Sequence, residues 1–256
     1  MERFGHFKLF FIYSIFIVLF IFSEVYALTG KEIIEKSEQL VQGNTQISVI
    51  NITIKTRRWT RTMKMKSYMD RHKPMKSFAD IVSPKKDAGN RFLMLGDRMW
   101  HYVPKLQQTI KISPSMMLQS WMGSDFTNDD IVKESSIIND YTHNLLGKEI
   151  VEGFECYKVE LIPNPDAAVV WGKVIYCART DNFLPVRQEY YNEHQVKKKV
   201  MTYSKFKKMD DRIIPTEYKM QTVSKKNRHT IMEITAAKFN VRIPDDIFTL
   251  QNLKRK

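Results

Sequence analysis

The order of apolar and polar residues along the chain predicts one helix near the start, followed by many strands. Thr29-Gly30-Lys31-Glu32 has the spacing of a capping box, and apolar residues recur at helical intervals from Ile33 to Val41. Gly43 is a typical helix stop. We therefore expect an amphipathic helix of about three to four turns.

Beyond this helix the period becomes alternating, which is typical of strands. Residues 59–70 alternate apolar methionines with threonines and lysines, and the turn Gly96-Asp97 has the length of a tight hairpin loop. Both faces of the hairpin at 92–103 are apolar, which predicts that both faces are covered. The expected strands are 46–55, 59–70, 92–95, 98–103, 107–112, 155–162, 171–178, 185–191, 196–206, 213–223 and 229–239.

The stretch 113–146 lacks this alternation and interrupts the strands. Leu118, Trp121, Met122 and Phe126 fall on one helical stripe, and the polar run from Thr127 resembles a second helix start. This predicts two short helices between two groups of strands. With polar turns elsewhere, the pattern indicates one α+β domain over residues 28–256, an antiparallel meander of about ten strands that curls or closes.

The first 27 residues predict a secretory signal peptide. The apolar run at 9–22 has 14 residues, too short for a bilayer span of roughly 20. Val25-Tyr26-Ala27 resembles a cleavage site, so we expect cleavage after Ala27 and export to the periplasm. No cysteine lies near that point, which excludes a lipid-modified N-terminus.

The expected export allows the two cysteines to form a disulfide with each other. Cys156 and Cys177 lie in two strands that flank the turn at 163–166. A hairpin centred between Asp166 and Ala167 places Cys156 opposite Cys177, at a distance that a disulfide tolerates. In an oxidising compartment this predicts a disulfide, with two unlinked buried thiols as the alternative.

Composition and motifs argue against an enzyme. The sequence has no G-x-S-x-G, no phosphate-binding glycine loop and no H-E-x-x-H, and its histidines are scattered. Asp129-Asp130 lies at an expected helix start, where negative charge complements the helix dipole. We expect no catalytic residues, no metal and no cofactor.

Charge is the strongest compositional signal. Forty-one Lys+Arg against 28 Asp+Glu give a net charge of +13, concentrated in the runs 197–199, 205–208, 224–228 and 254–256. These runs predict a solvated rim that protects strand edges from aggregation. Transient contact with an anionic membrane surface is the functional alternative, whereas nucleic acid is not expected because no aromatic residues interleave with the basic runs.

Methionine is the second signal, with 14 residues. Methionine fills irregular core gaps, but it also recurs on surfaces that adapt to variable apolar ligands. The methionine-rich middle stretch interrupts a sheet that is able to curl around a cavity. We therefore favour the interpretation that this stretch forms a lid that covers such a cavity.

Five segments, in this order, resemble the outer membrane lipoprotein-sorting protein family of LolA-like periplasmic carriers. They are 28–36 (LTGKEIIEK), 94–100 (MLGDRMW), 122–126 (MGSDF), 170–174 (VWGKV) and 243–248 (IPDDIF). The resemblance implies an incomplete, strongly curved antiparallel β-barrel with helices at its open side. It also implies a cavity for acyl chains, a gating arginine on the barrel wall, to which the sequence assigns no position, and association with an RND-type or ABC exporter.

The combined hypothesis is a periplasmic, non-enzymatic carrier of lipoprotein acyl chains or a phospholipid-like ligand. The alternative is a lipoprotein-sensing or transporter-accessory module that carries no lipid. The expected lipid-binding residues are Met63, Met65, Met69, Phe92, Met94, Met99 and Trp100 in the wall, with Met116, Met117, Leu118, Trp121, Met122 and Phe126 in the lid.

Overall fold

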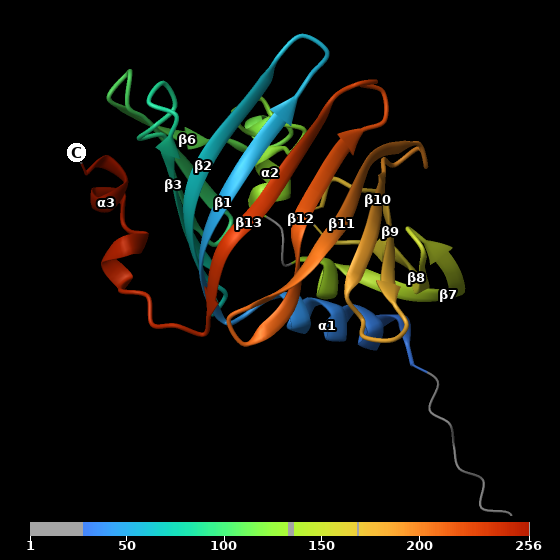
Figure 1. Ribbon diagram of the computed structural model, residues 1–256. Helices are drawn as coiled ribbons and strands as arrows, with labels where there is room; N and C mark the ends of the chain where they lie inside the picture. The colour runs from blue at the N-terminus through green and yellow to red at the C-terminus, as the bar shows by residue number, and fades with distance from the viewer. Residues whose placement is uncertain (1–27, 133–135, 168, 256) are drawn as a thin grey trace, which may run out of the picture.

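The computed structural model describes residues 28–132, 136–167 and 169–255, so the expected signal peptide at 1–27 lies outside the described residues. The described chain forms one antiparallel sheet of thirteen strands, not about ten, with short helices (Figure 1). The strands are β1 (Thr45–Lys55), β2 (Thr60–Asp70), β3 (Lys76–Ser83), β4 (Arg91–Leu95), β5 (Arg98–Val103), β6 (Gln108–Ile112), β7 (Tyr141–Val151), β8 (Phe154–Pro163), β9 (Lys173–Arg179), β10 (Pro185–Tyr191), β11 (Lys197–Met209), β12 (Arg212–Thr222) and β13 (His229–Phe239).

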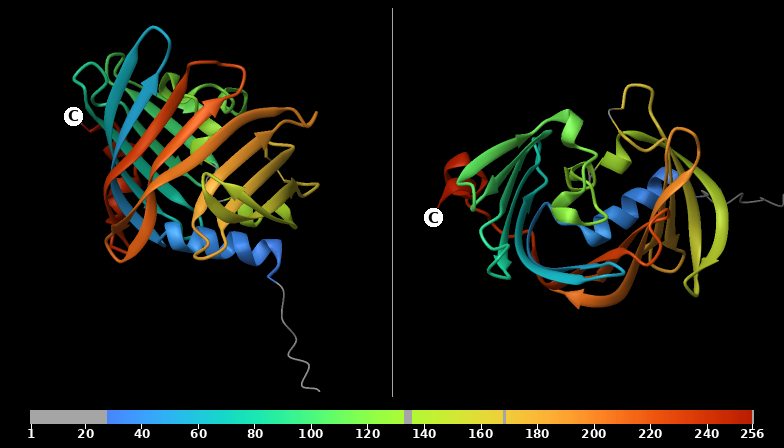
Figure 2. Two further views of the ribbon diagram at one scale, coloured as in Figure 1. Left: turned by 45° about the vertical axis from the view of Figure 1, so that its right-hand side comes forward. Right: turned by 90° about the horizontal axis from the view of Figure 1, so that it is seen from above.

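The first strand, β1, lies inside the sheet rather than at an edge, and the last strand, β13, pairs with it there. The order of the sheet is β6-β5-β4-β3-β2-β1-β13-β12-β11-β10-β9-β8-β7, and all neighbours are antiparallel. The chain meanders from β1 to one edge, crosses to the other edge at β7, and meanders back until β13 pairs with β1. Seen from above, the sheet curves into a half-barrel whose hollow faces the crossover (Figure 2). This confirms the curved antiparallel sheet that the turn pattern predicts.

The two strands beyond the sequence prediction, β3 and β7, both lack clean alternation. In β3, buried Phe78 and Ile81 are three positions apart, because Phe78 packs on the outer face and Ile81 packs on the inner face of the sheet. In β7, a bulge at Leu146 and an exposed edge leave apolar side chains facing solvent. A period of two is therefore hidden in both strands.

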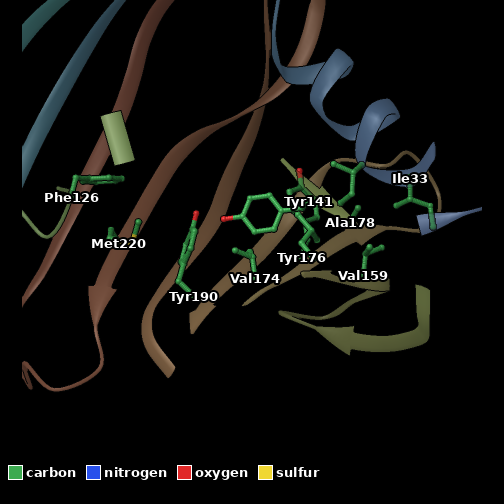
Figure 3. Close-up of a cluster of buried hydrophobic side chains, with 11 residues drawn as sticks. Ile33, Phe126, Tyr141, Val159, Val174, Tyr176, Ala178, Tyr190 and Met220 are labelled. Carbon is green, nitrogen blue, oxygen red and sulfur yellow. The ribbon is translucent and has the colours of Figure 1, made fainter. Parts of the chain in front are cut away.

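The N-terminal helix α1 (Gly30–Val41) starts with the predicted capping box. The Thr29 hydroxyl accepts from the Glu32 backbone N–H at 3.2 Å, and the Glu32 carboxylate accepts from the Thr29 backbone N–H at 2.7 Å. The helix lies inside the hollow, where Ile33 and Ile34 are fully buried against strands of the second half (Figure 3). Burying two such side chains contributes about 3–6 kcal/mol.

The crossover from β6 to β7 forms short helical segments in place of the two helices predicted within 113–146. This crossover segment (113–132 and 136–140) holds η1 (Pro114–Met116), η2 (Trp121–Gly123), α2 (Asn128–Val132) and η3 (Ser136–Ile138), and residues from 141 already belong to β7. Met122 has a left-handed φ of 51°, and Leu118 is 62% exposed. The expected helical stripe is therefore wrong, because the chain turns back on itself before a second helical turn can form.

The outer face of the first strands is also covered, as the hairpin with two apolar faces predicts. After β13 the chain passes outside the sheet and forms η4 (Asp245–Phe248) and α3 (Leu250–Lys254) (Figure 1). Phe248 and Leu253 pack there against Phe78 and Leu93. The first half of the sheet is thus sandwiched between the crossover segment and the C-terminus.

The predicted disulfide is absent, because the β8–β9 hairpin has a different register. Lys158 faces Cys177 and Cys156 faces Arg179, so the hairpin centre lies one residue further along and the cysteines are diagonal neighbours on one face. Both are free and fully buried. Diagonal positions lie about 7–8 Å apart, beyond the usual reach of a disulfide.

We expect these two thiols to resist alkylation in the native protein. Burial raises the pKa of Cys156 to about 11 and that of Cys177 to about 12, so little thiolate exists at pH 8. Iodoacetamide followed by intact mass should give no adduct within an hour under native conditions and two adducts in denaturant. Rapid labelling of the native chain would contradict this burial. An intact mass lower than that of the dithiol by two hydrogen atoms would show that the disulfide forms after all.

Candidate functional site

The hollow of the half-barrel contains an apolar cavity of about 230 Å³. Its wall is the concave face of the sheet, and α1 and the crossover segment close it from two sides (Figure 2). It is larger than an engineered apolar cavity of roughly 150 Å³ that binds benzene. The fold thus leaves a partly open space that its own side chains do not fill.

Seven of the thirteen side chains predicted to bind lipid line this cavity. The first half of the sheet supplies five and the crossover segment supplies two. They are Met65, Met69, Phe92, Met94, Met99, Trp121 and Phe126.

The other six predicted residues lie elsewhere. Met63 is fully buried in the core beside the cavity, and Met116, Met117 and Met122 are partly buried against that core. Leu118 faces solvent. Trp100 lies with the cluster on the outer face, where the Arg98 guanidinium is 5.7 Å from its ring centroid. Strand alternation explains this last difference, since Trp100 and Met99 are neighbours on opposite faces.

The second half of the sheet supplies lining residues that the sequence prediction missed. They occur in pairs two positions apart, which is the strand period, so the signal was present in strands already recognised. The pairs are Met201 and Tyr203 on β11, Tyr218 and Met220 on β12, and Met232 and Ile234 on β13; Tyr190 and Trp171 also contribute.

Polar groups at the α1 side of the hollow pair with one another. The Tyr176 hydroxyl lies 2.7 Å from Ser37 Oγ and donates to Glu38 Oε1 at 3.2 Å. Burial raises the pKa of Tyr176 and of Tyr203 well above the ordinary value, so both phenols stay neutral. This region therefore offers neutral hydroxyl groups beside the Glu38 carboxylate.

One polar group in the lining is unpaired. Trp121 is 2% exposed, packs against Phe92 with a centroid distance of 5.2 Å, and its indole N–H has no acceptor among the described residues. A buried donor without an acceptor costs about 1–3 kcal/mol. Such a group is satisfied by an oxygen atom of a ligand or by water.

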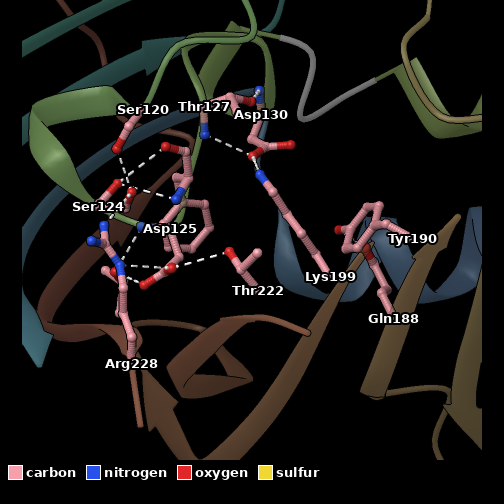
Figure 4. A network of polar contacts seen from close by, with 12 residues as sticks. Ser120, Ser124, Asp125, Thr127, Asp130, Gln188, Tyr190, Lys199, Thr222 and Arg228 are labelled. Atoms are coloured by element: carbon pink, nitrogen blue, oxygen red, sulfur yellow. Dashed lines mark hydrogen bonds and ion pairs between the residues drawn. The ribbon is translucent and has the colours of Figure 1, made fainter. Parts of the chain in front are cut away.

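Asp125 fastens the crossover segment to the barrel wall (Figure 4). Its fully buried carboxylate accepts from Thr230 Oγ1 at 2.8 Å, Thr222 Oγ1 at 3.1 Å and Arg228 Nε at 3.1 Å. Arg228 also donates to the carbonyl oxygens of Gly123 at 2.7 Å and Ser124 at 3.2 Å. Two strands and the turn between them thus hold one short loop of the crossover segment.

A second fastening joins α2 to β11. Lys199 Nζ lies 2.5 Å from Asp130 Oδ2, and the two side chains are only 9% and 8% exposed. Lys199 was expected on a solvated rim with Lys197 and Lys198, but it points into the hollow. The register between β10 and β11 shifts at this point, so Lys199 is separated from Lys197, which pairs with Glu189 instead. Breaking a buried ion pair by removing one partner costs about 3–5 kcal/mol.

The described residues contain no cluster of three or more His, Cys, Asp and Glu side chains that could hold a metal ion. Among them no helix has the length and apolar content to cross a membrane. The only histidine with a strongly shifted pKa within this part of the chain is His101, which stacks on Phe92 at 4.2 Å and lies 2.9 Å from Asn90 Oδ1. Burial lowers its pKa to about 4, so it is neutral at pH 7.

We expect His101 to make the protein less stable in mild acid. Its pKa is lower in the folded chain than in the unfolded chain, so its contribution to stability is complete above about pH 6.5 and is lost as the pH falls towards 4. Between pH 7 and pH 4 the wild type should lose about 2–3 kcal/mol more than His101→Gln, measured by urea unfolding at each pH. Parallel pH profiles for the two proteins would show that His101 is free to protonate.

Comparison with known proteins identifies the class to which this fold belongs. A structure of a DUF1329 family protein from Desulfovibrio piger superimposes with a TM-score of 0.81 at 22% identity, covering 88% of this chain and 97% of the other. A putative outer membrane lipoprotein-sorting protein domain from Vibrio parahaemolyticus gives 0.78 at 21%, covering 88% and 98%. A LolA superfamily protein from Nitrosomonas europaea gives 0.73 at 23%, covering 88% and 100%. The fold is LolA-like, as the sequence resemblance predicts.

The sequence itself matches the model of one protein family. Residues 73–255 match a family model described as "Uncharacterized protein", and the chain belongs to that family. No curated protein matches the chain.

Proposed function

We propose that this chain is a periplasmic, non-enzymatic carrier that holds acyl chains of lipoproteins, or another lipid, on the way to the outer membrane. The observation that carries the proposal is the partly open apolar cavity on the concave face of a LolA-like half-barrel. Each methylene group moved from water into such a cavity contributes about 0.8 kcal/mol. In this proposal residues 1–27 are removed on export, and residues 28–256 act as a single unit.

Trp121 adds a polar requirement to the proposed ligand. Its buried indole N–H has no acceptor among the described residues, in a lining that is otherwise mostly apolar. An ester or amide carbonyl at the head of an acyl chain is an acceptor of the right kind. The proposed ligand therefore has an apolar chain and a carbonyl group close to it.

The cavity must widen to take a whole acyl chain. Its 230 Å³ lies below the 300–1,000 Å³ of ordinary ligand pockets. The crossover segment is the natural moving part, since the contacts of Asp125 and Lys199 are polar and local. We propose Arg228 as the gating arginine, because it joins the barrel wall to two carbonyl oxygens of that segment.

The same small volume supports the alternative, a lipoprotein-sensing or accessory module that carries no lipid. In that case the crossover segment stays closed and its outer surface meets the partner. An RND-type or ABC exporter is not part of either proposal, since none of the three matched structures is described as belonging to one.

Lipid analysis of the purified protein distinguishes the carrier from the module that carries no lipid. Organic extraction followed by mass spectrometry should recover acyl lipid in near-stoichiometric amount, and a fluorescent fatty-acyl probe should bind the delipidated chain. Met201→Trp places a larger side chain in the cavity and should weaken probe binding at least tenfold. Lys207→Trp adds the same side chain at an exposed position of the same strand and serves as the control.

Two results would decide against the carrier. One is the absence of both co-purified lipid and probe binding in a folded wild type. The other is equal probe affinity in wild type and Met201→Trp, which would locate the probe outside the cavity.

A further inference from the structure

The turns at the two ends of the half-barrel carry opposite net charge. Since all neighbouring strands are antiparallel, successive turns alternate between the ends (Figure 1). The turns at 56–59, 84–90, 104–107, 164–172, 192–196 and 223–228 form one end, which we name the basic end. The turns at 71–75, 96–97, 152–153, 180–184 and 210–211 form the other, the acidic end.

Among the described residues, the basic-end turns expose seven basic side chains and two acidic ones. Arg57 and Arg58 lie in the β1–β2 turn, Lys225 and Lys226 in the β12–β13 turn, and three lysines in the β3–β4 and β5–β6 turns. The acidic-end turns expose one basic and five acidic side chains. A solvated rim that only maintains solubility has no reason to be sorted in this way.

Exposed apolar side chains accompany the cations at the basic end. Trp59 is 47% exposed next to Arg58, and Leu106 is 60% exposed next to the lysine of the β5–β6 turn. Tryptophan prefers the interface between lipid and water, where its ring is buried and its N–H stays solvated. Basic residues near an anionic lipid surface each strengthen attachment by about fivefold.

We propose that the basic end docks onto an anionic lipid membrane, with Trp59 and Leu106 entering the headgroup region. Charge complementarity selects this occupant, and the apolar tips distinguish it from a soluble polyanion. The proposal concerns the outside of the barrel and goes beyond the proposed cavity function. It corrects the expectation of a single basic rim, since the run at 205–208 lies towards the acidic end.

Docking would also reach the crossover segment directly. Arg228 follows Lys225 and Lys226 in the same turn and contacts the carbonyl oxygens of Gly123 and Ser124. Arg61, near the start of β2, bridges Asp87 and donates to the carbonyl of Met122 at 3.3 Å. The turns proposed to meet lipid are therefore the turns that hold the crossover segment.

Vesicle flotation tests the docking surface. The protein obtained by expressing the full chain should float with vesicles containing 30% phosphatidylglycerol in phosphatidylcholine, and raising the salt should release it. Lys225→Glu/Lys226→Glu should weaken binding at least about twentyfold. Lys207→Glu/Lys208→Glu makes the same charge change near the acidic end and should change binding by less than threefold.

Arg57→Glu/Arg58→Glu provides a second test at a separate turn, and Trp59→Ser should weaken binding without changing its salt dependence.

Equal loss in the 225/226 and 207/208 variants would overturn the proposal, as would equal binding to purely neutral vesicles. Binding to a DNA duplex that vesicles do not compete away would also overturn it. Acyl-probe uptake should survive in the docking variants and fail in Met201→Trp, so failure of docking and failure of the carrier are distinguishable.

Discussion

Replacing Asp125 by alanine should lower the free energy of unfolding by about 3–5 kcal/mol, which is the cost of removing one partner from a buried charge pair. The Asp125 carboxylate is fully buried and accepts three side-chain hydrogen bonds from two strands and the turn between them. Without it, the Thr230 hydroxyl and the Arg228 guanidinium lose their shared acceptor. Urea unfolding followed by tryptophan fluorescence measures the difference.

Asp166→Ala, at an exposed loop position, is the matched control and should change stability by less than about 0.5 kcal/mol. Limited proteolysis adds a local readout, because the crossover segment of Asp125→Ala should be cut faster than that of wild type. A loss below about 1 kcal/mol, with an unchanged cleavage pattern, would mean that Asp125 does not hold the segment.

Trp121→Ala should cost about 3–5 kcal/mol, since it deletes a large buried side chain from the closed side of the cavity. Phe92, at a centroid distance of 5.2 Å, belongs to a strand of the sheet, and such a strand relaxes only partly into the space left behind. The cavity should enlarge accordingly. Denaturant unfolding gives the energy, and uptake of a bulky acyl probe reports the added volume.

Trp121→Phe separates packing from hydrogen bonding. Because the indole N–H has no acceptor among the described residues, this variant should lose less than about 1.5 kcal/mol of stability yet bind acyl probes more weakly. Trp59→Ala, at an exposed turn, controls for loss of a tryptophan and should leave stability nearly unchanged. Equal stability of Trp121→Ala and Trp59→Ala would contradict the buried position of Trp121.

Local patterns predicted most of the fold because most of its contacts are between consecutive strands. Polar turns and alternation locate eleven strands, and the spacing Thr29 to Glu32 locates α1. The strand β3 escaped because both of its faces carry buried apolar side chains, and β7 escaped because a bulge disturbs its alternation. What the pattern could not supply was the pairing of β1 with β13, which no local signal encodes.

Two local errors have the same physical origin, the conformation of a few turn residues. One residue in the β8–β9 connection moved Cys177 from opposite Cys156 to opposite Lys158. A left-handed φ at Met122 ended the expected helix. Apolar periodicity predicts which side chains are buried, but it carries little information about the dihedral angles of single residues.

The sequence predicted the cavity lining of the first half of the sheet but not that of the second half. The methionines of β2, β4 and β5 drew attention because they are numerous, and Met65, Met69 and Met94 do line the cavity. The lining residues of β11 to β13 include tyrosines and an isoleucine and stood out less. Trp100 illustrates the limit, since both faces of β5 are apolar and only the tertiary structure distinguishes them.

The position of β1 at the centre of the sheet has a consequence for how the protein forms. Gln46 pairs with Phe239, so one whole edge of β1 waits for the last strand of the chain. A chain that emerges N-terminus first makes the β1–β6 meander early, but leaves that edge of β1 open until β13 arrives. Such late pairing of distant segments slows folding and exposes a strand edge to other chains. During synthesis, the middle of the finished sheet is therefore the part most in need of protection.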